Sequence, residues 1–314
     1  MPALPVKIEA KMRNNILIPK RIQLEVVFGC NAKCVMCPVD MPTKRKKGVM
    51  SMELFRKIID DLKPFAAQIE KVDLWGLGEP LLDKTLFEKI RYAKREGFQS
   101  IAIATNGDLM NEKHQDALLS SGIDTIIFSI DGYRKSTHEN IRKGVNFDSI
   151  VANAESIIRK RDAGNYKTRF VFRFIRQESN KAEWDDFRAY WKARISSEKK
   201  DLIIGYGAHT WGGELGDPQD RIAARDQAID AKPCHHVYDR LMILWDGTVP
   251  LCCSDLHHAN YSLGNVRDAS PIEIFNNEKI TAIRAINEKG KKTSMKICSD
   301  CTILYSEAAQ DVYA

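Results

Sequence analysis

Apolar residues in this chain gather in short runs, and longer stretches with a helical period separate the runs. Six of the runs are nearly all apolar over five to seven residues. Such runs are typical of strands that are covered on both faces, as in a parallel sheet. The predicted strands are residues 23–28, 71–75, 100–104, 125–130, 169–175 and 202–206. Their alternation with helical stretches predicts an α/β fold.

The stretches between these strands carry helix start and stop residues. Ser51 is placed to cap a helix that continues to residue 63, because its hydroxyl can accept a hydrogen bond from a free backbone N–H. Gly97 follows a helix over residues 84–96, a common way for a helix to end. Further helices are predicted over residues 112–120, 149–161 and 181–192. Right-handed crossovers would curl the sheet into a partial (β/α)6, TIM-like barrel.

The alternation ends near residue 211. Glycine and proline crowd residues 212–218, which predicts a linker. Beyond it, Asp246-Gly247 separates two short apolar runs, 241–245 and 249–252, as in a β-hairpin, and a helix is predicted over residues 272–288. We therefore divide the chain into an N-terminal extension, a core and a small C-terminal domain with its linker. The expected boundaries are 1–20, 21–215 and 216–314.

Composition excludes several classes of protein. The 314 residues are 44% hydrophobic and 29% charged, which is ordinary for a folded domain. No apolar run is long enough to span a membrane, and the first twenty residues lack a signal-peptide core. The net charge of +6 is spread along the chain, and the basic runs 44–47 and 159–161 are expected to be solvated faces. We expect a cytoplasmic protein that binds neither nucleic acid nor membrane.

Three of the eight cysteines share one short loop after the first strand. Cys30, Cys34 and Cys37 have the spacing C-x3-C-x2-C. Three thiolates can hold a [4Fe-4S] cluster and leave one iron open to a small molecule. Zinc is the alternative, although zinc fingers use C-x2-C pairs closed to four ligands. In a chain of this length without a signal peptide, metal binding explains the cysteines better than disulfides do.

Four more cysteines form a second set in the C-terminal part. Twelve residues lie between Cys234 and Gly247 and four between Gly247 and Cys252, and Cys298 and Cys301 follow as C-x2-C. Four thiolates suffice for a fully ligated [4Fe-4S] cluster. Zinc held by four cysteines is equally possible from the residues alone.

The three-cysteine loop resembles that of the radical SAM superfamily, in which the open iron binds S-adenosylmethionine (SAM). The turn Gly76-Leu77-Gly78-Glu79-Pro80 is similar to the G-G-E-P element that receives the SAM amine. Ser129 and Asp131 are similar to the S-x-D-G element of the fourth strand. The resemblance implies SAM contacts at Met36, Gly76, Gly78, Glu79, Asn106, Ser129, Asp131 and Arg142.

The second cysteine set resembles the auxiliary-cluster module called SPASM, in its shortened "twitch" form. This resemblance implies one auxiliary [4Fe-4S] cluster. Its ligands would be Cys234, Cys252, Cys298 and Cys301. The resemblance to the radical SAM superfamily implies that SAM is cleaved to a 5′-deoxyadenosyl radical, with electrons from an external donor such as flavodoxin or ferredoxin.

The eighth cysteine, Cys253, has no ligand role in this count and is either a core residue or a catalytic one. The chain resembles enzymes of the butirosin and neomycin pathways, which dehydrogenate an aminocyclitol or epimerise a sugar, and in radical SAM epimerases a free cysteine donates a hydrogen atom. We expect hydrogen abstraction from a carbinol C–H of a sugar- or aminocyclitol-like small molecule, then epimerisation through Cys253. Dehydrogenation to a ketone and modification of a peptide are the alternatives. The expected mouth-lining residues are Trp75, Arg173, Tyr206, His209, Trp211, Trp245, Asp255 and His257.

Overall fold

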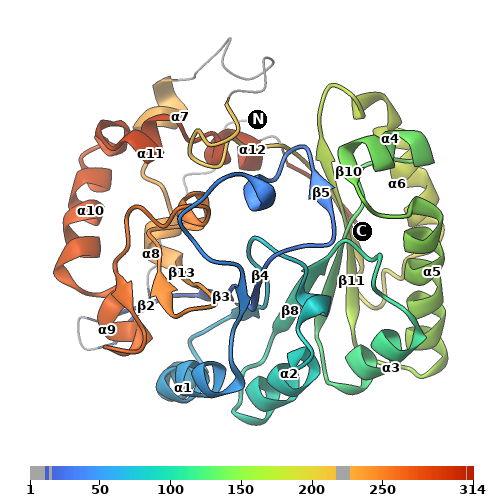
Figure 1. Cartoon of the computed structure of the whole chain (residues 1–314), viewed down its shortest axis with the longest axis horizontal. Helices are drawn as coiled ribbons and strands as arrows, with labels where there is room; N and C mark the ends of the chain where they lie inside the picture. Colours follow the sequence, from blue (N-terminus) through green and yellow to red (C-terminus); the bar gives the residue numbers. More distant parts are fainter. Residues whose placement is uncertain (1–10, 14–15, 217–226, 309) are drawn as a thin grey trace.

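The computed structural model describes residues 11–13, 16–216, 227–308 and 310–314. A curved sheet of eight strands forms its centre (Figure 1). In spatial order the strands are β13 (Arg240–Ile243), β3 (Arg21–Leu24), β7 (Lys71–Asp73), β8 (Ile101–Thr105), β9 (Thr125–Ser129), β11 (Arg169–Arg176), β12 (Leu202–Gly207) and β16 (Asp311–Tyr313). All pairs are parallel except β12 with β16. The six predicted strands are present, and the predicted TIM-like partial barrel is confirmed.

Helices cover the outer face of this sheet (Figure 1). They are α1 (Met52–Leu62), α2 (Leu86–Arg95), α3 (Glu112–Ser120), α4 (Lys135–Ile141), α5 (Phe147–Ala163) and α6 (Trp184–Lys192). The first begins as predicted, because the Ser51 side chain accepts a hydrogen bond from the Leu54 N–H. Its residues Phe55, Ile58 and Ile59 are fully buried, so burial of an apolar helix face holds this layer on the sheet.

The C-terminal part contributes to the barrel itself. β13 pairs with β3, while β14 (Thr248–Val249) pairs with β15 (Gly264–Asn265). The predicted turn at Asp246-Gly247 is present, with Gly247 at φ 92° and Leu244 N–H donating to Thr248 O at 2.8 Å, but the two runs form their strand ladders with β3 and β15. Leu241, Met242 and Ile243 are all buried. A run that is apolar on both faces belongs inside a parallel sheet rather than in an exposed hairpin.

Short elements complete the C-terminal part, and α7 to α11 lie on the left side of Figure 1. They are α7 (Gln227–Ala231), α8 (His236–Asp239), α9 (Pro271–Phe275), α10 (Glu278–Glu288), α11 (Lys296–Ser299) and α12 (Ile303–Ala308). The single helix predicted over 272–288 is thus broken into α9 and α10. Asn277 caps the second helix. The Asn276 side chain binds the backbone N–H and C=O of Leu17 at 2.9 and 3.0 Å, which ties β2 (Ile16–Ile18) to this domain; β2 itself pairs with β1 (Lys11–Arg13).

The lysines of the run 44–47 and Arg159 are exposed, as expected, but each basic run also contains one arginine whose side chain is buried. Arg161 pairs with Asp201 at 2.7 Å, and both side chains are inaccessible to solvent. Arg45 pairs with Glu25 beneath the cysteine loop. Burying one carboxylate with one guanidinium satisfies both charges. Across the described ranges, no helix has the length and apolarity needed to cross a membrane.

Candidate active site

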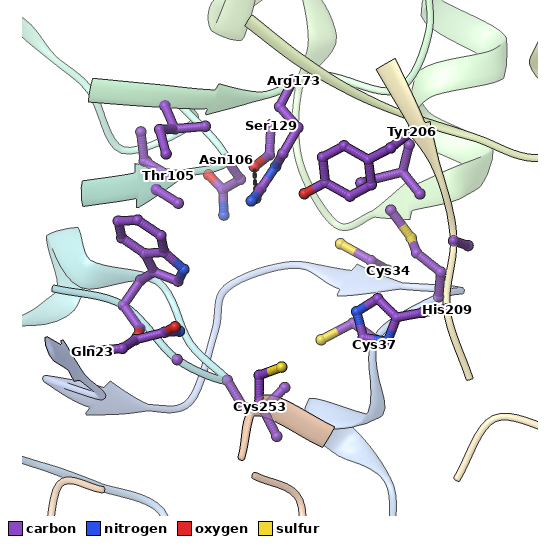
Figure 2. A pocket seen from close by; sticks show the side chains of 18 of the residues that line it. Gln23, Cys34, Cys37, Thr105, Asn106, Ser129, Arg173, Tyr206, His209 and Cys253 are labelled. Atoms are coloured by element: carbon purple, nitrogen blue, oxygen red, sulfur yellow. Dashed lines mark hydrogen bonds between the residues drawn. The ribbon is translucent and has the colours of Figure 1, made fainter. Parts of the chain in front are cut away.

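A cavity of about 460 Å³ opens at the C-terminal ends of the barrel strands. Figure 2 shows Cys34, Cys37 and Cys253 facing it from one side and Asn106 and Ser129 from the other. Cys30 also lines it. The fold therefore gathers the three loop cysteines, which are close in sequence, with residues from distant parts of the chain.

Two short strand pairs hold the cysteine loop in place. The loop leaves β4 (Val27–Phe28), which pairs with β6 (Gly48–Val49). Within the loop, β5 (Lys33–Cys34) pairs with β10 (Arg142–Lys143). The second pairing brings the end of α4 to the cysteines, more than one hundred residues away in sequence.

The Gly-Leu-Gly-Glu-Pro turn packs directly against the start of the cysteine loop. Gly29 N–H donates to Leu77 O at 3.1 Å, and Glu79 N–H donates to Gly29 O at 3.0 Å. A Cβ atom on Gly78 would lie 2.3 Å from the Val27 carbonyl oxygen, which no side chain can tolerate. Gly78 therefore allows two backbone segments to meet, and both glycines of the turn also line the cavity.

Glu79 is buried and binds its own scaffold. Its carboxylate accepts hydrogen bonds from Leu81 N–H (3.2 Å), Thr105 Oγ1 (2.8 Å) and Asn106 N–H (2.8 Å). Burial raises the pKa of Glu79 to about 7, although these hydrogen bonds oppose the shift. The carboxylate thereby fixes Asn106, whose amide nitrogen lies 2.9 Å from Asn31 Oδ1 and 3.8 Å from the sulfur of Cys30.

A buried ion pair lies beside the second cysteine of the loop. Arg142 pairs with Asp131 at 2.6 Å, and its other terminal nitrogen donates to the Cys34 sulfur at 3.5 Å. Asp131 also accepts from Ile175 N–H at 2.6 Å, and its own N–H donates to His138 Nδ1 at 3.2 Å. Burial and the Arg142 charge lower the pKa of His138 to about 3. The predicted SAM contact Arg142 thus also contacts a loop cysteine.

The other predicted SAM contacts lie at the same cavity. Ser129 and Met36 line it. The Ser129 hydroxyl accepts a hydrogen bond from Arg173 (Figure 2). The Met36 backbone carbonyl accepts from Trp211 Nε1 at 2.9 Å, which links the loop to the segment after β12.

Burial holds the loop thiols in their protonated form in the cluster-free chain. It raises the pKa of Cys30 to about 11 and that of Cys37 to about 12, and it also raises the pKa of Cys34. The charge of Cys34 adds to the shift of the other two, so the three sulfurs are close enough to interact. A metal centre that binds here must displace these protons.

A second, smaller cavity of about 40 Å³ contains the C-terminal cysteine set. Cys234, Cys252, Cys298 and Cys301 all line it. The pKa values of all four thiols are raised. Burial is the main cause for Cys234, Cys298 and Cys301, whereas for Cys252 the hydrogen bond to its neighbour Cys253 contributes most. The residues from three separate segments are therefore brought together as one four-thiol site.

Cys253 lies between the two cavities. It is buried and lines both of them. The backbone turns into a short 3-10 helix at Cys253–Asp255 directly after Cys252. This turn directs one of two adjacent cysteines toward the barrel cavity, as Figure 2 shows for Cys253.

Five of the eight residues expected at the mouth line the cavity, namely Trp75, Arg173, Tyr206, His209 and Trp211. The other three are engaged elsewhere. Trp245 donates to Lys46 O at 3.0 Å, Asp255 accepts from three backbone N–H groups, and His257 lies 3.3 Å from Glu214.

The sequence reasoning missed four basic residues of the lining: Arg21, Lys71, Arg169 and Arg240. Each is the first residue of a barrel strand. Side chains alternate between the two faces of a strand, so assigning alternate residues of each predicted strand to the inside of the barrel could have identified them.

Comparison with known proteins identifies the two halves of this arrangement. The family model of the radical SAM superfamily matches residues 24–167, and that of the iron-sulfur cluster-binding domain SPASM matches residues 234–302. Residues 24–167 form a radical SAM domain. This radical SAM protein therefore has the SPASM-type C-terminal domain that its cysteine spacing predicts.

Individual proteins are similar to this radical SAM protein over most of its length. It is 24% identical to the tungsten-containing aldehyde ferredoxin oxidoreductase cofactor-modifying protein of Pyrococcus furiosus, over 90% of this chain and 87% of that protein. The structure of BtrN in complex with AdoMet and 2-DOIA has a TM-score of 0.60 at 18% identity, with 90% and 93% covered. Streptococcus suis SuiB bound to its precursor peptide SuiA has a TM-score of 0.62 at 16% identity, with 93% and 72% covered. At these identities the two structures establish the shared fold.

The radical SAM domain implies SAM and a [4Fe-4S] cluster as cofactors, and the SPASM domain implies auxiliary iron–sulfur chemistry, which confirms the predicted cofactors. The barrel site fits a cluster, because hydrogen-bond donors face its sulfurs. Ala32 N–H lies 3.4 Å from the Cys30 sulfur, and Arg142 donates to Cys34. Such donors stabilise thiolates that carry the charge of a cluster. The four thiols that line the second cavity fit a fully ligated centre.

Proposed function

We propose that this radical SAM enzyme removes a hydrogen atom from a carbinol C–H of a sugar- or aminocyclitol-like molecule and epimerises that carbon. In this proposal Cys253 donates the replacing hydrogen atom. The observation that carries it is the position of Cys253, which is not needed as a ligand and lines the same cavity as Cys30, Cys34 and Cys37. The barrel wall around that cavity would shield a reactive substrate from water.

The ligand roles follow the two cavities. Cys30, Cys34 and Cys37 would hold the cluster that binds SAM, and the four cysteines of the smaller cavity would hold one auxiliary cluster. When bound, the first cluster and SAM supply a 5′-deoxyadenosyl radical that takes a hydrogen atom from the substrate. The proposed SAM contacts are Met36, Gly76, Gly78, Glu79, Asn106, Ser129, Asp131 and Arg142. Their support is that all but Asp131 line the cavity directly, and Asp131 holds Arg142.

The chain's own part in the reaction is hydrogen transfer by Cys253. The S–H bond breaks, a C–H bond forms on the opposite face of the substrate carbon, and a sulfur-centred radical remains on Cys253. One electron and one proton must restore the thiol before the next turnover. We propose that an external donor such as flavodoxin or ferredoxin supplies that electron.

A hydrogen-atom donor must keep its proton until the transfer. In the cluster-free chain, a hydrogen bond from Cys252 lowers the pKa of Cys253, and the positive charges of His236, Arg240 and His209 also favour its thiolate. As a cluster ligand, Cys252 would have no proton to donate. Burial, which disfavours the thiolate, would then favour the thiol that the proposed step needs.

Oxidation of the same carbinol to a ketone is the second candidate. Its support is the four-thiol cavity, which shares the lining residue Cys253 with the barrel cavity and could receive the electron that oxidation releases. BtrN, whose complex contains 2-DOIA, has a similar fold over nearly its whole length. Modification of a peptide is the third candidate, supported by the similar fold of SuiB bound to SuiA.

The test is turnover in heavy water. Anaerobically reconstituted enzyme, with about eight irons expected for two clusters, is supplied with dithionite, SAM and a panel of neutral and charged polyols or a peptide. One solvent deuteron in an epimerised product, absent with Cys253→Ala, is the expected result. If the unchanged enzyme and Cys253→Ala both form a ketone in equal amount, the reaction is oxidation of the carbinol and the epimerisation proposal is rejected. If no 5′-deoxyadenosine forms in any reaction, with or without an added compound, the proposal is overturned.

A further inference from the structure

Basic side chains outnumber acidic ones along the wall of the barrel cavity. Among its described lining residues, six are basic, and two, Glu79 and Glu307, are acidic. The basic residues are Arg21, Lys71, Arg142, Arg169, Arg173 and Arg240. Because low-dielectric walls focus the field of such charges, the excess creates a positive potential inside the cavity.

The two acidic residues do not neutralise this excess. Glu79 is surrounded by the three hydrogen-bond donors described above. Glu307 lies 3.0 Å from His235 Nε2 and 3.1 Å from His236 Nε2. Burial opposes ionisation of Glu307, but the hydrogen bonds from the two histidines outweigh it and hold its pKa well below the ordinary value. Both carboxylates thus form their hydrogen bonds with groups other than the six basic residues, although the charge of Glu307 also acts on Arg21.

Three of the six basic residues have carboxylate partners behind the cavity wall. Arg142 pairs with the buried Asp131. Arg21 and Lys71 share the single carboxylate of Asp73, at 2.7 and 3.2 Å. Asp73 is fully buried, so one negative charge serves two positive ones.

Arg169, Arg173 and Arg240 form no salt bridge with another residue that the structure describes, although the charge of Arg240 helps to lower the pKa of its neighbour Asp239. Arg169 reaches only Thr125 Oγ1, at 3.5 Å, and Arg173 donates to Ser129. The guanidinium of Arg240 makes no hydrogen bond to another described residue, and the Nε atoms of Arg173 and Arg240 are buried without a partner. Buried donors without an acceptor are costly, and at the cavity wall a ligand can supply the acceptor that Arg173 and Arg240 lack.

Two of these arginines lie at the floor of the barrel, where the parallel strands begin. Arg240 is the first residue of β13 and is paired with Arg21 of β3. Arg169 is the first residue of β11. Burial, and then the charges of Arg21 and Arg169, lower the pKa of Lys71, against the opposing charge of Asp73. These basic groups therefore act on one region, at the end of the cavity away from the cysteine loop.

We propose that Arg169 and Arg240 form an oxyanion site that binds a carboxylate or phosphoryl group of the substrate. The inference rests on the proposed function, since it concerns the substrate of the same cavity. Arg169 and Arg173 are four residues apart on one face of β11, or about 13 Å, and Arg173 lies beside Ser129 at the level of the cysteine loop. The substrate is a polyhydroxy compound whose anionic group lies roughly 10 Å from its reacting carbon.

The test is anion binding by the reconstituted protein without SAM. Isothermal titration calorimetry at constant ionic strength compares sodium phosphate, sodium acetate and neutral glycerol. We expect phosphate or acetate, but not glycerol, to bind with a millimolar Kd. Phosphate binding points to a phosphorylated substrate and acetate binding to a carboxylic acid. Failure of both anions to bind overturns the proposal.

Variants locate the binding. Arg169→Gln and Arg240→Gln are each expected to raise the Kd about tenfold, because each removes a charge-assisted hydrogen bond. Arg159→Gln is the matched control, since Arg159 is 71% exposed and outside the cavity. Arg169→Lys and Arg240→Lys should restore much of the affinity, which separates lost charge from misfolding. Weakening in only one of the two glutamine variants, or in neither, overturns the two-arginine site.

A separate assay keeps this proposal distinct from the proposed function. Reductive SAM cleavage, measured as 5′-deoxyadenosine, tests the radical chemistry. Anion binding without cleavage would retain the oxyanion site and reject the radical reaction. Cleavage without anion binding would reject the oxyanion site alone.

Discussion

The two cysteine-lined cavities differ in volume and in the polar groups around their sulfurs. The barrel cavity measures about 460 Å³ and the second about 40 Å³. In the first, Asn106, Arg142 and the backbone of Ala32 face the sulfurs. In the second, the Ser254 hydroxyl lies 3.3 Å from Cys301. Three thiols with space beside them suit an iron that takes up a small molecule, whereas four thiols without that space suit a closed centre.

Removing one cysteine from each cavity should give the largest contrast. Cys34→Ala is expected to abolish SAM cleavage, at least a thousandfold, because two thiolates cannot hold the cluster that binds SAM. Cys298→Ala should lose only the second centre and still form 5′-deoxyadenosine. Iron content, expected to fall from about eight to about four in both variants, and product formation measure the difference. Equal loss of cleavage in both would contradict separate roles for the two cavities.

The ion pair beside Cys34 should make the barrel site the more fragile of the two. Arg142→Ala leaves Asp131 as an unpaired charge that is 0% exposed, a change that typically costs about 3–5 kcal/mol. Denaturant unfolding of the cluster-free protein measures this cost. The exposed pair Arg56–Glu88, with side chains 50% and 49% accessible, provides the control, and Arg56→Ala should cost under about 1 kcal/mol. A cost for Arg142→Ala as small as that of the control would refute the importance of this pair.

Two buried carboxylates should give the two regions different pH responses. Burial raises the pKa of Glu79 from 4.5 to about 7 and that of Asp255 from 3.8 to about 6. Over these ranges the folded chain binds more protons than the unfolded chain, so the free energy of unfolding falls as pH rises, by up to about 3 kcal/mol for each group. Unfolding of Glu79→Gln and Asp255→Asn between pH 4 and 8, relative to the unchanged protein, measures each contribution. Parallel curves for all three proteins would exclude both shifts.

The smallest expected effect concerns the second cavity alone. Ser254→Ala removes the hydroxyl beside Cys301, and one hydrogen bond of about 1 kcal/mol corresponds to roughly 40 mV for a one-electron couple. The reduction potential of the auxiliary centre should fall by about that amount, because a donor to sulfur stabilises the reduced cluster. Redox titration followed by electron paramagnetic resonance measures both centres. A matching shift of the barrel centre would show that the two sites are not electrically independent.

Much of the barrel could be predicted because its strands are apolar on both faces and its helices end at glycine. The pairing partner of β13 could not be predicted, because an apolar run such as 241–245 does not indicate which strand it pairs with. The helix over 272–288 fitted its period, yet Asn276 bonds to Leu17 instead and breaks it. Tertiary contacts decided both cases against the local pattern.

The site shows the same division. Cysteine spacing predicted which thiols share a cavity. Cys30, Cys34 and Cys37 lie on one short loop, whereas the second set spans three separate segments and was predicted from its resemblance to the SPASM spacing. The pairing of Arg142 with Asp131 and Cys34 depends on a β5–β10 contact between distant segments, so the sequence could suggest Arg142 as a SAM contact but not this ion pair. Arg169 and Arg240 stand at the starts of two strands, and only closure of the sheet makes them line one cavity.

The pairing of β13 with β3 also affects how the chain can be made and cut. While the ribosome is still producing the segment before residue 240, one border of β3 has no neighbour to bond its backbone amides. In a fragment that stops after β12, this edge of β3 stays unpaired, and unpaired edge strands tend to pair with strands of other molecules. We therefore expect the barrel to aggregate when it is expressed without the C-terminal part.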